Sequence, residues 1–146
     1  MTSITLAQAD AIADRALQKG REMKFHPLTV AILDAGGHLV VLKRSDNSSL
    51  LRPEIATGKA WGALGLGFGG RELARRAQAV PAFFTALNAM SDGRMVPVAG
   101  GALIRDRTGA IIGSIGVSGD TSDNDEVALI AAVEGEGLVA ETGDPH

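Results

Sequence analysis

The sequence has no cysteine and no tyrosine, and it has only one tryptophan and four phenylalanines among its 146 residues. Without cysteine the chain can form no disulfide, thiolate nucleophile, iron–sulfur cluster or cysteine-ligated zinc site. Cysteine-free chains suit a reducing compartment, so we expect a cytoplasmic protein. The few aromatic side chains leave little material for stacking nucleotide bases or sugar rings.

The sequence also lacks a strong charge of one sign and a long hydrophobic run. Its net charge is -3 and its pI is about 5.5, so we expect no nucleic-acid partner. Residues 1–5 have neither the basic start nor the apolar core of an export signal. The longest uncharged stretch, residues 77–91, contains Gln78 and Pro81 and is too short to span a bilayer. We therefore expect no membrane partner.

Hydrophobic periodicity and turn signals predict one α+β domain over residues 1–146. Thr5 and Gln8 form a capping box at the start of the first helix, and Thr121 or Ser122 caps the last one. Hairpins join the strands, so the predicted sheet is antiparallel and covered by helices, while residues 141–146 are expected to fray. The predicted helices cover residues 5–24, 53–66, 70–80, 81–90 and 122–140, and the predicted strands cover residues 28–33, 39–44, 96–105 and 110–118.

The three histidines are the first candidates for chemistry. His26 follows the first helix beside Pro27, where a neutral imidazole could ligate haem iron or another metal. The alternative is a structural histidine that meets the dipole at the end of the helix. His38 follows a Gly-Gly turn, where most side chains are solvated, and His146 is terminal. No spacing of histidines and carboxylates indicates a dedicated zinc or non-haem iron site.

Charged residues around the second predicted helix form another candidate group. Glu54 and Lys59 are five residues apart, so a direct i,i+4 pair is not expected. Lys59 precedes the apolar stretch 60–64, where it would either cap carbonyls of a neighbouring strand or subunit or bind a carboxylate ligand. Ser118 does not lie in a nucleophile elbow, and residues 65–70 lack the Lys-Ser/Thr of a phosphate-binding loop.

Three glycine-rich segments, residues 34–38, 98–102 and 113–119, occur in order around Glu54-Ile-Ala-Thr-Gly-Lys-Ala60. Together with Asp125, this pattern resembles the small bacterial family named after its GlcG and HbpS members, often called haem-degrading domains. The resemblance covers nearly the whole chain. It implies a profilin-like fold with an antiparallel sheet of about five strands flanked by helices, and a homo-oligomer. Members commonly have a second glycine where this chain has Asp120.

Several proteins of that family bind haem, so the resemblance leads first to a haem-binding or tetrapyrrole-binding protein with a pocket between subunits. Weak haem-degrading activity would be compatible with it. In this hypothesis His26 is the axial metal ligand, and the other cofactor-binding candidates are arginines that could pair with propionates. These are Arg44, Arg75 and Arg76, with Arg71 as a further choice.

Two other hypotheses remain open. In one, the chain is an enzyme acting on a small carboxylate-bearing catabolite of a degradation pathway. Arg44 or Lys59 would then hold the carboxylate, and Glu54, Asp120 or Asp125 would act as general acid or base. Its catalytic candidates are Glu54, Lys59 and Asp125. In the other hypothesis the chain is an accessory structural subunit without a ligand.

Overall fold

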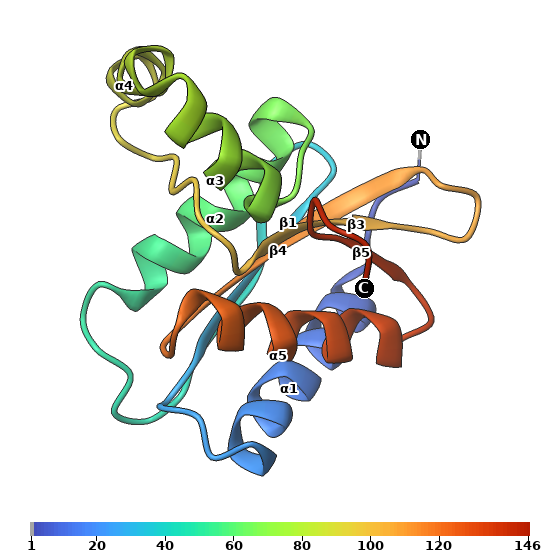
Figure 1. The fold of residues 1–146 in the computed structure, drawn as a ribbon. Coiled ribbons are helices and arrows are strands. Elements are labelled where there is room, and N and C mark those ends of the chain that lie inside the picture. Colours follow the sequence, from blue (N-terminus) through green and yellow to red (C-terminus); the bar gives the residue numbers. More distant parts are fainter. Residues whose placement is uncertain (1) are drawn as a thin grey trace.

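The computed structural model describes residues 2–146, which form a five-stranded antiparallel sheet with helices on both faces (Figure 1). The strand order across the sheet is β2-β1-β4-β3-β5. The α+β class and the antiparallel sheet predicted from the sequence are confirmed. In chain order the elements are α1 (Leu6–Glu22), β1 (Thr29–Asp34), β2 (Leu39–Arg44), α2 (Arg52–Leu66), α3 (Gly70–Ala79), α4 (Pro81–Met90), β3 (Gly101–Arg105), β4 (Ile111–Ser118), α5 (Ser122–Gly135) and β5 (Val139–Glu141).

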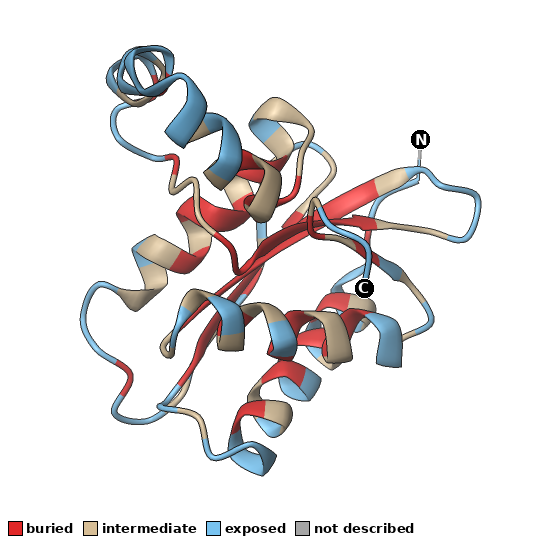
Figure 2. Ribbon diagram, viewed as in Figure 1, coloured by how far each residue is buried: buried red, intermediate tan, exposed pale blue. Residues whose placement is uncertain are grey.

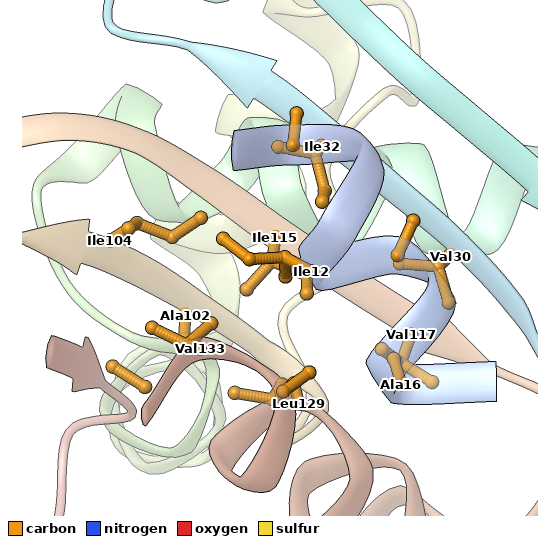
Figure 3. Packing of buried hydrophobic residues seen from close by; sticks show 14 of the residues in the cluster. Ile12, Ala16, Val30, Ile32, Ala102, Ile104, Ile115, Val117, Leu129 and Val133 are labelled. Atoms are coloured by element: carbon orange, nitrogen blue, oxygen red, sulfur yellow. The ribbon is translucent and has the colours of Figure 1, made fainter. Parts of the chain in front are cut away.

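The main hydrophobic core lies between one face of the sheet and the helices α1 and α5 (Figures 1 and 3). Side chains alternate along a strand, so Val30 and Ile32 of β1 point to this face together with Ile115 and Val117 of β4. Ile12 of α1 is fully buried against them. The buried residues of α1 and α5 therefore close this core.

The other face of the sheet carries small residues, and α2 packs on it closely. Gly116 of β4 has no room for a side chain, because a Cβ there would overlap the carbonyl group of Ala56. The buried Ser114 hydroxyl donates a hydrogen bond to the carbonyl of Ala60 at 2.8 Å. The small side chains on both elements therefore let the backbone of α2 approach the sheet, which places Lys59 under β4.

The C-terminal segment differs from the prediction. The last helix ends at Gly135 instead of residue 140, because Gly137 adopts a left-handed φ of 77° and closes a helix-ending turn. The chain then forms β5, which pairs with β3. Residues 141–146 were expected to fray, but the amide of Arg71 donates to the carbonyl of Thr142 at 2.9 Å. The tail is thereby held against α3.

The segment before β3 also differs from the prediction. A strand was expected from residue 96, but β3 begins only at Gly101. Pro97 offers no amide hydrogen to a ladder, and Gly100 adopts a φ of 101°, so neither continues a strand. The irregular segment instead crosses α2, where the amide of Val96 donates to the carbonyl of Gly58. Figure 2 shows that β1, β3 and β4 are mostly buried, whereas α4 is largely exposed.

Candidate functional site

His26 lies in the turn between α1 and β1, and Asp120 fixes its backbone. The His26 amide donates to Asp120 Oδ2 at 2.8 Å. Asp120 Oδ1 also accepts hydrogen bonds from the Thr121 amide and the Asn124 side chain. These donors, the His26 amide first, hold the pKa of Asp120 below its usual value. The residue that departs from the family pattern therefore anchors the turn that carries His26.

The three histidines differ in the surroundings of their rings. His38 Nδ1 lies 3.1 Å from Asp34 Oδ1. His146 Nε2 lies 2.9 Å from Glu134 Oε1. The exposed ring of His26 has no hydrogen-bond or ion-pair partner within residues 2–146. His26 is thus the histidine of the described chain with both ring nitrogens available to a ligand.

Lys59 and Asp125 form a buried ion pair between α2 and the start of α5. Their side chains are 3% and 1% exposed, and Lys59 Nζ lies 3.2 Å from Asp125 Oδ2. Lys59 Nζ also donates to the carbonyl of Val117 at 2.9 Å. Lys59 therefore caps a carbonyl of a neighbouring strand, which is one of the two alternatives that the sequence left open. Burial lowers the pKa of Lys59 and raises the pKa of Asp125, while the attraction between the two opposes both shifts.

One network joins these residues at the end of β4. The Asp120 amide donates to Asp125 Oδ1 at 3.0 Å, which links the buried pair to the turn that holds His26. The network therefore contains four residues predicted from the sequence: Lys59, Asp120, Asp125 and, through its backbone amide, His26. Arg52, which sequence reasoning missed, donates to the hydroxyl of Ser118 at 3.0 Å beside them.

Glu54 lies elsewhere, in a groove of about 640 Å³ beside the first turns of α2. The guanidinium of Arg94 also lines this groove and lies over the Trp61 ring, 4.3 Å from its centroid. Neither Arg94 nor Trp61 was named as a candidate site residue from the sequence. The only signals in the sequence are that Trp61 is the single tryptophan and that Arg94 ends the charged segment 91–94. The lining residues come from β2 and its hairpin, from α2 and from the segment that follows α4: Gly37, Leu42, Pro53, Glu54, Ile55, Thr57, Gly58, Trp61, Asp92, Gly93, Arg94 and Val96.

The predicted cofactor-binding arginines already have partners. Arg44 donates to the carbonyl of Ser48 at 2.6 Å. Arg75 pairs with Glu72 and Asp144 at 2.7 and 2.6 Å. Arg76 pairs with Glu72 at 2.9 Å. An incoming carboxylate would have to compete with these groups. Of these contacts, the pair of Arg75 with Asp144 is the one that attaches the tail to α3.

Residues 2–146 contain no group of three or more histidine and carboxylate side chains arranged to hold a metal ion. Their helices include none with the length and hydrophobicity needed to cross a bilayer.

Comparison with known proteins places these observations in a family. Residues 4–134 match the model described as "Haem degrading protein HbpS-like". A 15.0 kDa uncharacterized protein from the dhaT-dhaS intergenic region of Citrobacter freundii is 28% identical over 134 residues, which are 92% of each chain. The HbpS crystal structure is 27% identical with a TM-score of 0.79, covering 92% of this chain and 90% of that one.

A haem complex of PduOC shares the fold, with a TM-score of 0.84 and 24% identity, over 98% of this chain and 100% of that one. The corrinoid adenosyltransferase PduO of Citrobacter freundii is 27% identical over 123 residues, and these are 36% of its length. The chain thus spans about a third of that larger relative.

Proposed function

Because the chain belongs to the HbpS-like family, we propose that it binds haem or a related tetrapyrrole with His26 as the axial ligand. The observation that carries this proposal is the exposed His26 ring, without a partner in residues 2–146, on a turn anchored by Asp120. Proteins hold haem iron with histidine, cysteine, methionine or tyrosine, and this chain has no cysteine or tyrosine. His38 and His146 already contact carboxylates.

The residues around His26 fit an iron ligand on chemical grounds. The Asp120 hydrogen bond involves the His26 amide and not the ring, so it orients the turn and leaves the imidazole free. Bound haem would supply an iron centre for ligand or redox chemistry. Arg44, Arg75 and Arg76 are the candidates for its propionates, each by exchange with the partner it has now.

We also propose that the protein is a cytoplasmic homo-oligomer, in which a second copy covers the open face of a surface-bound tetrapyrrole. Large apolar side chains outside the core support an association: Leu50 is 85% exposed, Met90 is 76% exposed and Phe83 is 55% exposed. Charge is absent from α4, which carries two of these three. Exposed apolar surface of this kind is common where subunits meet.

A second candidate function is an enzyme that acts on a small carboxylate, and the position of Glu54 in the groove favours it. Glu54 would be the general acid or base there. Lys59 and Asp125 are buried against β4 and bind each other, so in this candidate they would position α2 and would not touch a substrate bound in the groove.

Titration of the haem-free protein with haemin tests the haem proposal. We expect a saturable one-to-one Soret shift, and a loss of affinity of at least about tenfold in His26→Ala, since an axial ligand is removed. His38→Ala is the matched control because it also removes an exposed imidazole. An equal, unsaturable shift in all three proteins would indicate nonspecific adsorption and contradict the proposal.

A further inference from the structure

We propose that the groove beside α2 binds a small apolar monocarboxylate through Arg94. This site is separate from His26 and does not depend on haem; it deepens the second candidate function, which places a small carboxylate in the same groove. The observation behind it is a guanidinium that lines a groove of about 640 Å³ and has no carboxylate partner within residues 2–146. Arginine presents two parallel donors to a carboxylate, so an unpaired guanidinium in a groove is suited to such a ligand.

Arg94 is held in one orientation before any ligand arrives. Its Nε donates to the carbonyl of Ser91 at 3.0 Å, and its guanidinium lies on the Trp61 ring. Both terminal nitrogens are left without hydrogen-bond partners in the described chain. The exposed residues 92–94 are anchored at both ends, because Ser91 and Met95 are 4% and 6% exposed. A preorganised side chain loses less conformational freedom when it binds a ligand.

The walls of the groove define the rest of the ligand. Leu42, Pro53, Ile55 and Val96 provide apolar surface, and the volume lies within the roughly 300–1,000 Å³ typical of small-molecule sites. A monocarboxylate with an apolar ring or chain therefore matches one guanidinium and these walls.

The acidic side chains refine this choice. Glu54 and Asp92 line the same groove as Arg94, so a second negative charge on the ligand would be repelled. A hydroxyl group on the ligand could instead donate a hydrogen bond to the Glu54 carboxylate. The groove thus favours a hydroxylated apolar monocarboxylate over phosphates and dicarboxylates.

Calorimetric titration of the haem-free protein with trans-4-hydroxycyclohexanecarboxylate tests this inference. We expect saturable binding that is weakened about tenfold to a hundredfold in Arg94→Met, as for loss of a hydrogen-bonded charge. Arg107→Met is the matched control, since Arg107 is exposed and lies outside the groove. The neutral carboxamide and trans-cyclohexane-1,4-dicarboxylate are expected to bind more weakly than the probe.

The outcomes separate this site from the haem proposal. His26→Ala should bind the probe as the wild type does, whatever its affinity for haemin. Trp61 is the sole tryptophan of the chain and lines the groove, so binding of the probe should also change the tryptophan fluorescence. Absence of saturable heat in the wild type would overturn the inference, and so would equal binding by Arg94→Met or by the carboxamide.

Discussion

Replacing Lys59 with methionine is expected to lower the free energy of unfolding by about 3–5 kcal/mol, because Asp125 would remain as an uncompensated charge in the interior. Both side chains are almost fully buried, so water cannot take over the lost interaction. The carbonyl of Val117 would lose its donor as well. Chemical denaturation measures the loss, which corresponds to a melting temperature lower by roughly 10 °C.

The double variant Lys59→Met with Asp125→Leu is the control for this prediction. It removes both charges together, and we expect it to recover most of the stability, because buried ion pairs are often no better than apolar side chains of similar volume. A loss below about 1 kcal/mol in Lys59→Met would contradict the description of a buried, coupled pair. If Lys59→Met does not fold, Asp125→Asn tests the same ion pair by removing the charge of the other partner.

The pKa shifts of Lys59 and Asp125 determine how the stability difference between the wild type and the double variant depends on pH. Burial raises the pKa of Asp125 above 3.8, so its contribution to stability is present below that pH and is lost as the pH rises through the folded-state pKa. Burial lowers the pKa of Lys59 below 10.5, so its contribution is present above that pH and is lost as the pH falls. The free energy of unfolding of the double variant, relative to that of the wild type, should therefore be highest near neutral pH.

Gly116→Ala is expected to destabilise the fold by about 3 kcal/mol, because the added Cβ would overlap the backbone carbonyl of Ala56. The added Cβ is attached to the backbone of β4 and would meet the backbone of α2, so the strain can be relieved only by moving α2 away from β4. Chemical denaturation measures the stability. Since α2 carries Trp61, a shift of its fluorescence should accompany the loss.

Gly65→Ala is the control in α2, the helix that packs against Gly116 of β4. A Cβ at Gly65 meets nothing within 4 Å, and alanine favours a helix more than glycine does. We therefore expect this variant to be as stable as the wild type or slightly more stable. Equal stability of Gly116→Ala and Gly65→Ala would show that α2 does not approach the sheet as closely as described.

The parts of the fold that local signals determine were predictable from the sequence. Thr5 and Gln8 form the capping box, and the Gly37 amide closes the hairpin turn onto Asp34. The strand Val139–Glu141 was not predictable in this way, because its pairing with β3 joins residues far apart in the sequence. A segment of three residues is too short to show the periodicity that distinguishes a strand from the end of a helix.

The candidate site shows the same limit. The position of His26 beside Pro27 could be read locally, but its contact with Asp120 joins residues 94 positions apart. The burial of Lys59 was suggested by its apolar neighbours, whereas its partner Asp125 lies 66 positions away. Arg94 could not be found in this way, because nothing local in the sequence shows that the segment carrying it folds back onto Trp61.

Chemical rescue of His26→Gly tests the central claim, haem binding through His26, most directly. The variant leaves a space where free imidazole can replace the missing ring as an iron ligand. We predict that His26→Gly loses the Soret spectrum of the wild-type haem complex and that added imidazole restores it, while His38→Gly keeps it throughout. A His26→Gly complex with the wild-type spectrum in the absence of imidazole would contradict the assignment of His26 as the axial ligand.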